Sequence, residues 1–318
     1  MTDFQVFIQQ MITGLSNGTI IALIALGYTM VYGIIELINF AHGDLFMLGA
    51  FMALTIIGVF GLDGGGVIGA PGAILLLFVV VPVFCGAVNW GVDRFAYAPL
   101  RNAPRLAPLV CAIGVSFVFL NIGLFWGGVP LEVFNFGRTA ASPKDFPALV
   151  GSTNLLGEHV IQFTLKDLLV FAVTIPLMVT LTFLVKYTKL GKAMRAVAQN
   201  PVAARLMGVN VDSIIGTTFI LGGALAGVAS VVYALYNNTI YFQMGYRVGM
   251  DAFTAAVLGG IGNLPGAVLG GLVIGIFRAL SDQYVATQWT NVVVFTVLIL
   301  VLVFRPSGLL GTSVKDKV

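Results

Sequence analysis

The sequence has few charged residues. Asp, Glu, Lys and Arg make up 9% of its 318 residues, whereas 58% are hydrophobic. A soluble domain carries roughly 25% charged residues. This composition excludes an ordinary soluble globular domain, because most of the surface would have to meet lipid rather than water.

Several chemical motifs are also missing. Cys85 and Cys111 both fall in apolar runs, which argues against a disulfide framework or a thiolate metal site. His42 and His159 lie far apart in the sequence, so no metal site is expected. The sequence contains no G-x-x-x-x-G-K-[ST], H-E-x-x-H or nucleophile-elbow motif. We therefore expect neither ATP hydrolysis by this chain nor an intramembrane enzyme.

Long apolar runs dominate the sequence instead. Runs near the ~20 residues that cross a bilayer occur at residues 11–35, 72–91, 106–126, 165–185, 214–236 and 290–304. Shorter helices are expected at 44–60, 250–259 and 265–282. Because the alternation of a membrane barrel is absent, we predict an all-α polytopic membrane protein with broken or short helices. It has nine transmembrane helices, or eight if 44–60 is only re-entrant. The start lacks a basic segment, so no cleaved signal peptide is expected.

Basic residues gather in three polar segments. They are Arg94, Arg101 and Arg105; Lys186, Lys189, Lys192, Arg195 and Arg205; and Arg305, Lys315 and Lys317. Cytoplasmic loops carry an excess of Lys and Arg, so all three segments should be cytoplasmic. This topology places residues 127–164 and the N-terminus outside. The basic residues in these segments could simply be solvated next to the lipid, or they could form a surface that binds a partner.

A short internal repeat suggests the arrangement of the spans. PGAIL at 71–75 recurs as PGAVL at 265–269, each opening an apolar helix after a glycine-rich break. One copy would cover about 11–91 and the other about 214–282, in opposite orientations, as in many transporters. The whole chain, 1–318, forms one transmembrane domain, with a cytoplasmic segment at 186–212. Glycines four residues apart in the second copy, such as Gly271 and Gly275, favour close helix packing over ligand contact.

Charged and polar residues within apolar segments are informative, because placing such side chains in lipid costs free energy. Glu36, Asn39, His42 and Asp44 cluster in one break. We expect Asp44 and Asp251 to cap the helices that follow them, and His42 to form a hydrogen-bonded joint rather than a gate. Breaks at 39–44 and 259–265 would free backbone groups for a substrate. The candidate pathway residues are Asn39, Phe40, His42, Asp44, Phe253, Thr254, Gly259, Gly260 and Asn263.

Four blocks of the sequence resemble a known family. They are GYTMVYGI at 27–34, INFAHGD at 38–44, LGKAMRA at 190–196 and AFTAAVLGGIG at 252–262. In these blocks the chain resembles the permease subunits of branched-chain amino acid ABC importers. The resemblance covers nearly the full length and is weakest between residues 127 and 164.

The resemblance implies an assembly in a bacterial inner membrane. Its members would be this permease, a second related permease, two cytoplasmic ATPases that bind ATP and Mg²⁺, and a periplasmic substrate-binding protein. No cofactor in this chain and no nucleic-acid partner are expected. Residues 191–208 would contain coupling helices that dock on the ATPases, with Pro201 starting the second helix and Gly208 ending it. The candidate coupling residues are Gly191, Lys192, Arg195, Ala198, Asn200, Ala204, Arg205 and Gly208.

Two other functions stay open at this level. A stand-alone secondary transporter or channel that couples transport to protons or Na⁺ is expected to have buried carboxylates in the middle of its spans. The spans 11–35, 106–126 and 165–185 have none there, which favours the ATP-driven permease. Permeases similar to this one could also carry urea, short amides or other amino acids, because the soluble binding protein is expected to set most of the selectivity.

Overall fold

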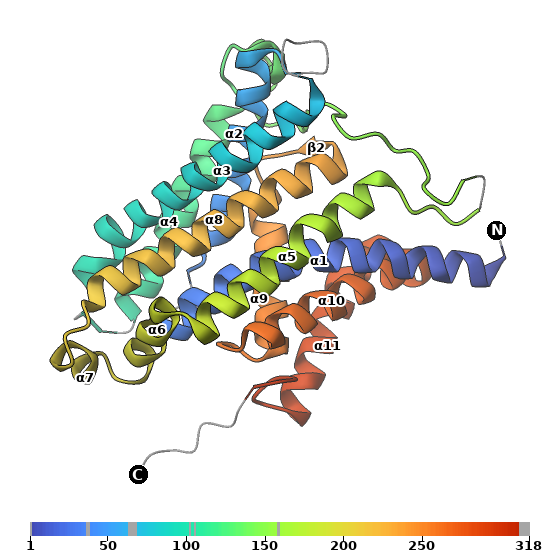
Figure 1. Cartoon of the computed structure of the whole chain (residues 1–318). Helices are drawn as coiled ribbons and strands as arrows, with labels where there is room; N and C mark the ends of the chain where they lie inside the picture. Colours follow the sequence, from blue (N-terminus) through green and yellow to red (C-terminus); the bar gives the residue numbers. More distant parts are fainter. Residues whose placement is uncertain are drawn as a thin grey trace.

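The protein is a bundle of long helices (Figure 1). This computed structural model describes residues 2–35, 39–62, 69–101, 103–104, 106–157 and 160–311. The long helices are α1 Asp3–Ile35, α2 Ala41–Phe60, α3 Ala70–Val92, α4 Leu106–Trp126, α5 Leu165–Tyr187, α8 Val211–Asn237, α9 Met244–Gly259, α10 Leu264–Ser281 and α11 Thr290–Phe304. Two short helices, α6 Lys189–Gln199 and α7 Pro201–Leu206, follow α5.

Short helical turns and one small sheet connect these elements. A π-helical turn, Asp93–Tyr97, and a 3-10 turn, Ala98–Leu100, extend α3, while Asp282–Ala286 and Thr287–Trp289 join α10 to α11. A third 3-10 segment, Glu132–Gly137, lies between α4 and α5. Strand β1 (Lys144–Asp145) pairs antiparallel with β2 (Thr239–Ile240).

The prediction of an all-α polytopic membrane protein is confirmed. Within the described ranges, seven helical stretches are long and apolar enough to cross a membrane, and the last of them, Leu264–Phe304, contains both α10 and α11. Helix α9, with 16 residues, is not among these seven stretches. The number of crossings, eight or nine, therefore stays a prediction.

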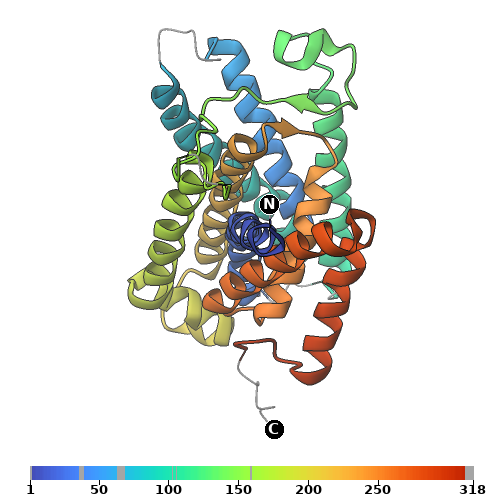
Figure 2. The same ribbon diagram turned by 90° about the vertical axis from the view of Figure 1, so that its right-hand side faces the viewer.

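Helices α1, α2 and α8 form the centre of the bundle. Figure 2 looks nearly along α1, which is surrounded by the other helices. The buried core includes Leu23 and Leu26 of α1, Phe46 of α2 and Phe219 of α8. The outer helices α3, α4, α5 and α11 present exposed apolar side chains such as Phe117, which suits a surface that meets lipid or another membrane subunit.

Glycines allow several helices to approach closely. Gly271 and Gly275 of α10 lie against α1, where a Cβ atom on Gly271 would sit 2.5 Å from the Cα atom of Ala22 and one on Gly275 would overlap Gly18. On α8, a Cβ atom on Gly227 would lie 2.7 Å from the Cα atom of Pro82 in α3. The prediction that the glycines spaced four apart serve helix packing is confirmed at these contacts.

The two ends of the bundle differ in character. At one end, the segment 127–164 folds over the helices, and the buried ammonium group of Lys144 donates hydrogen bonds to the carbonyl oxygens of Thr139 (2.6 Å) and Phe134 (3.4 Å). Burial lowers the pKa of Lys144. Gln9 at the start of α1 exchanges hydrogen bonds with the backbone of Gln162 (2.7 and 3.1 Å), so α1 begins at this end.

The opposite end carries basic residues. Arg101 pairs with Asp93 at 2.7 Å and with Asp212, which follows α7. Lys186 and Arg195 border the same hollow as Pro306 and Ser307, which follow Arg305. The described parts of the three basic segments therefore share one end, as the topology prediction requires. Arg105, Lys315 and Lys317 lie outside the described residues.

Candidate functional site

The first break joins α1 to α2 and is organised by Asn39. The Oδ1 atom of this buried residue accepts hydrogen bonds from the Ala41 amide (3.1 Å) and the Tyr97 hydroxyl (2.9 Å), while its Nδ2 atom donates to Asn89 (3.4 Å). Helix α2 consequently starts at Ala41. Glu36, which belongs to the same polar cluster in the sequence, lies outside the described residues.

The prediction that Asp44 caps a helix is wrong. Asp44 is already inside the first turn of α2, and its Oδ2 atom accepts a hydrogen bond from the hydroxyl of Ser116. Within the described part of the chain, its Oδ1 atom has no hydrogen-bond partner. Ser116 stands midway along α4, so Asp44 carries a carboxylate deep into the bundle.

The prediction of a hydrogen-bonded joint at His42 is also wrong. Neither ring nitrogen of His42 has a hydrogen-bond partner among the residues that the structure describes. The ring packs edge-on against Tyr28, with 4.8 Å between ring centroids, and it touches Gly27, where no side chain would fit. His42 therefore acts as a packing residue between α1 and α2. His159 is outside the described residues.

A hollow of about 260 Å³ lies between α2, α4 and α9. Its lining brings together three of the candidate pathway residues, Phe40, Asp44 and Phe253, with Tyr28 and Ser116 beside them. The rings of Phe40 and Phe253 are 6.0 Å apart. The hollow is largely apolar with one carboxylate at its wall, so it can hold a small apolar group near a polar one.

Other candidate pathway residues do not line this hollow. Asn39 and His42 are buried behind it, and the hydroxyl of Thr254 donates to the carbonyl oxygen of Met250 at 2.8 Å within α9. A role of these three residues in transport stays a prediction. Their positions favour support of the hollow over contact with its contents.

The second break, between α9 and α10, lies at the basic end of the bundle rather than midway along it. Residues 305–311 cover it, because the Leu310 amide donates to Gly259 (3.0 Å) and the Leu309 amide donates to Leu258 (2.8 Å). Asn263 accepts from the Gly266 amide (3.1 Å) and donates to the Leu310 carbonyl (2.6 Å). Gly260 meets Gly311 there. The backbone groups of this break are thus bound by the chain itself.

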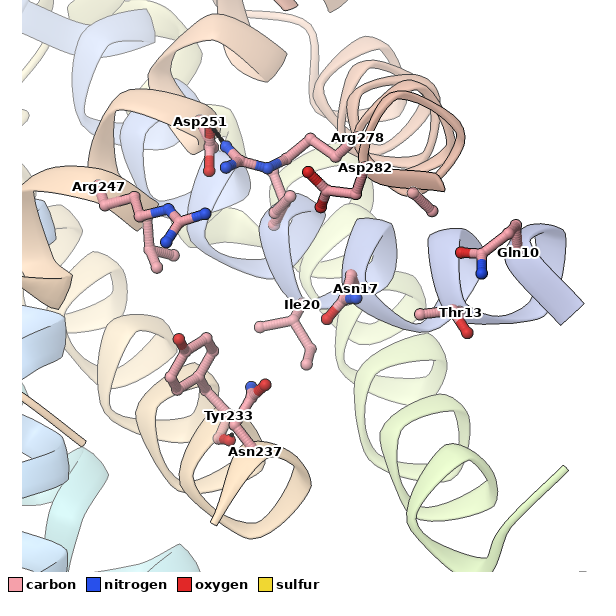
Figure 3. Close-up of a pocket in the computed structure, with 13 residues that line it drawn as sticks. Gln10, Thr13, Asn17, Ile20, Tyr233, Asn237, Arg247, Asp251, Arg278 and Asp282 are labelled. Carbon is pink, nitrogen blue, oxygen red and sulfur yellow. Dashed lines mark hydrogen bonds and ion pairs between the residues drawn. The ribbon is translucent and has the colours of Figure 1, made fainter. Parts of the chain in front are cut away.

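A second, charged cavity of about 310 Å³ lies near the other end of the bundle (Figure 3). Arg247, Asp251, Arg278 and Asp282 line it. The prediction that Asp251 caps a helix is wrong, because α9 already begins at Met244 and Asp251 forms an ion pair with Arg278 of α10. This cavity was not predicted from the sequence. A signal for it was an Arg followed four residues later by an Asp, once within α9 (Arg247 and Asp251) and once across the end of α10 (Arg278 and Asp282).

A buried carboxylate on α5 was missed as well. Asp167 accepts hydrogen bonds from the hydroxyls of Ser16 in α1 (2.6 Å) and Tyr236 in α8 (3.2 Å). It also completes a capping box with Thr164. The pattern T-x-x-D at 164–167 could have revealed the cap, whereas the contacts with α1 and α8 depend on the tertiary fold.

The candidate coupling residues form two consecutive helices. Thr188 caps α6 by accepting from the Gly191 amide (3.1 Å), so the first of the two helices begins at Lys189. Asn200 caps α7 by accepting from the amides of Val202 and Ala203 (3.0 Å each). Pro201 is the first residue of α7. Gly208 follows the helix with φ +84°, so the predicted start and end of α7 are confirmed.

The outer face of α7 is apolar. Leu206 is 85% exposed and Met207 is 84% exposed, and neither was among the candidate coupling residues. Ala204, one of the candidate coupling residues, is buried within the chain, so its side chain is not part of this exposed face. The guanidinium group of Arg195 donates to the Val185 carbonyl of α5. Lys192, Asn200 and Arg205 are exposed around the two helices, and Ala198 is half-buried.

Comparison with known proteins assigns the family. The chain is 40% identical to the high-affinity branched-chain amino acid transport system permease protein LivH of Escherichia coli K12, over 99% of both chains. It is 39% identical to the corresponding protein BraD of Pseudomonas aeruginosa PAO1, over 100% of both. It is 27% identical to the autoinducer 2 import system permease protein LsrC of Escherichia coli O9:H4, over 74% of both.

No solved structure matches the chain. The family described as "Branched-chain amino acid transport system / permease component" matches residues 10–302, nearly all of the helical bundle. The chain therefore belongs to the family of permease components of branched-chain amino acid transport systems.

Proposed function

We propose that this chain is a transmembrane subunit of an ATP-driven importer in a bacterial inner membrane. It works with a second related permease, two cytoplasmic ATPases that bind ATP and Mg²⁺, and a periplasmic substrate-binding protein. The observation that carries the proposal is the exposed α6–α7 unit, whose apolar residues Leu206 and Met207 protrude at the basic end of the bundle. Large exposed apolar side chains in such a position favour docking of a protein.

The geometry of α6 and α7 suits the transmission of force. The Arg195 guanidinium holds α6 to the end of α5, and Arg101 joins Asp93 at the end of α3 to Asp212 at the start of α8. A partner that grips Leu206 and Met207 would therefore move α5 and α8 together. In this assignment the exposed Lys192 and Arg205 make charge-assisted contacts at the rim of the docked surface.

Branched-chain amino acids are the proposed substrates. The relatives that share 39–40% identity over the full length carry this substrate in their names. The hollow that contains Phe40, Phe253 and Asp44 offers apolar walls beside one carboxylate, which suits an aliphatic side chain next to an ammonium group. A more distant relative is named for autoinducer 2, so substrate choice within related permeases depends on local side chains and on the binding protein.

Uptake by the reconstituted complex tests this function. Proteoliposomes that contain both permeases, the ATPases and the binding protein should transport labelled leucine only when ATP is supplied on the side of the membrane that carries the ATPases. Leu206→Asp should lower the uptake rate at least tenfold, because the charge would be buried in the docked surface. Leu156→Asp, at an exposed position of the opposite end, is the control. Uptake by the permease alone without ATP would contradict the proposal.

A further inference from the structure

The charged cavity near the outer segment is built between four helices. Its wall contains Asn17 of α1, Tyr233 of α8, Arg247 of α9 and Arg278 of α10. It lies at the end where Gln9 binds the segment 127–164, opposite α6 and α7 (Figure 1). Charged side chains in a membrane-spanning bundle are costly and mark functional sites by default. The cavity is therefore a candidate functional site.

Only two of the four charged side chains that line the cavity form an ion pair with each other among the described residues. Arg278 and Asp251 form an ion pair, with side chains 11% and 12% exposed, and the Asp282 carboxylate accepts one hydrogen bond from the Thr290 hydroxyl. Within the described part of the chain, the Arg247 guanidinium has neither a hydrogen-bond nor an ion-pair partner. Figure 3 shows Arg247 and Asp282 on opposite sides of the cavity, with Asn17 on the wall below.

We infer that this cavity is a binding site for a zwitterionic α-amino acid on its way into the importer, an inference that rests on the proposed function. Arg247 can bind a carboxylate through two parallel N–H···O bonds, while Asp282 and the Asn17 amide oxygen receive the ammonium group. Ile20 and Val248 provide an apolar part of the wall. A plain anion would meet two carboxylates and a plain cation would meet two guanidinium groups, so only a ligand with both charges matches the lining.

The charged cavity and the hollow that contains Asp44 each share wall residues of α9 with a third hollow. This third hollow, of about 550 Å³, shares Arg247 and Asp251 with the charged cavity. It also shares Tyr246 and Met250 with the hollow beside Asp44. The three spaces follow successive faces of α9. In this proposal, an amino acid bound at Arg247 would move along α9, past these shared residues, toward Asp44 in the middle of the bundle.

Binding by the wild-type complex tests the charge requirement without any mutation. Labelled leucine is equilibrated with the two-permease, two-ATPase complex in nanodiscs, without the binding protein, whose own selectivity would otherwise dominate. The competitor 4-methylpentanoate lacks the ammonium group, and isopentylamine lacks the carboxylate. Each should compete at least tenfold more weakly than unlabelled leucine. Equal competition by either analogue, or no saturable leucine binding, would overturn the inference.

Substitution of Arg247 locates the site. Arg247→Gln should raise the Kd for leucine at least tenfold, and Arg247→Lys, which keeps the charge but loses the bidentate geometry, should give an intermediate Kd. Arg138→Gln removes the same charge from an exposed position in the outer segment and should leave the Kd unchanged. If ATP-driven uptake by the wild-type complex is present but Arg247→Gln binds leucine normally, the site is wrong and the proposed function stands. Absence of wild-type uptake would instead refute the function.

Discussion

At the scale of single residues, the ion pair between Arg278 and Asp251 links α9 to α10 at the end of the bundle that is opposite to their connecting turn. Both side chains are nearly buried, so each charge depends on the other for compensation. Removing one partner of such a pair leaves a buried charge and typically costs about 3–5 kcal/mol. Replacing both partners by apolar residues of similar volume is often close to neutral.

We expect Arg278→Met to lower the free energy of unfolding by about 3 kcal/mol. The thermal unfolding midpoint of the purified protein should fall accordingly. The double variant Arg278→Met with Asp251→Leu should recover most of that loss, because no charge then remains unpaired. Thermal unfolding in detergent measures both effects. A double variant as unstable as the single one would show that the pair acts through something other than mutual neutralisation.

Some residue-level roles could be predicted from the sequence and others could not. Pro201 and Gly208 were placed correctly because a helix start and a helix end depend on local backbone chemistry. Asp44 and Asp251 were misassigned as caps because the sequence shows no partner for them. Their partners, Ser116 and Arg278, are distant in the sequence or lie on another helix, so only the tertiary fold brings them together.

At the scale of elements, the contact between α1 and α10 depends on glycine. Gly14 and Gly18 of α1 face Gly271 and Gly275 of α10, and a Cβ atom on Gly14 would lie 2.9 Å from the Cα atom of Ile276. Backbones that touch so closely gain dispersion contacts that lipid cannot replace. The neighbour of each missing Cβ atom is backbone, which cannot rotate away as a flexible side chain could.

Gly275→Val should therefore force α1 and α10 apart. Overpacking of a tight contact costs about 1–3 kcal/mol, and the folded fraction after detergent extraction should fall accordingly. Gly114→Val in α4 is the matched control, since a Cβ atom at Gly114 meets nothing within 4 Å. Size-exclusion chromatography of the two variants compares them. If both variants kept the same folded fraction, the α1–α10 contact would not determine the stability of the protein.

The positions of the long helices followed from apolar runs, but several boundaries did not. Helix α1 starts at Asp3 rather than near residue 11, and α9 starts at Met244 rather than near residue 250. Both missed starts contain polar residues, Gln9 in α1 and Arg247 in α9, which an apolar run excludes. Gln9 is held by the outer segment, whereas Arg247 faces the charged cavity, so these polar residues are compatible with helix.

At the scale of the whole molecule, the helices pair in a way that suits two opposed copies. Helix α1 packs against α10, and α3 packs against α8. If α1–α3 and α8–α10 are copies, each pair joins the first helix of one copy to the third helix of the other. We propose this exchange as the packing of the inverted repeat expected over residues 11–91 and 214–282. It places α9, with the hollows along it, between the two copies.

The molecule also separates two chemical tasks between its ends. The end near residues 127–164 holds the charged cavity, whereas the opposite end presents the apolar face of α7 among basic residues. The central claim is that force from a separate ATPase enters at α7 and acts on the path along α9. This claim requires α7 to lie in the cytoplasm and to contact the ATPase.

Cysteine labelling and cross-linking of Met207→Cys test both requirements most directly. Wild-type Cys85 is buried and Cys111 is half-buried, so the background is measured on the wild-type chain. In intact cells, a membrane-impermeant maleimide should label Leu156→Cys in the outer segment but not Met207→Cys. In inverted membrane vesicles, Met207→Cys should cross-link to the ATPase subunit. Labelling of Met207→Cys from outside, or no cross-link in a complex that transports leucine, would contradict the account.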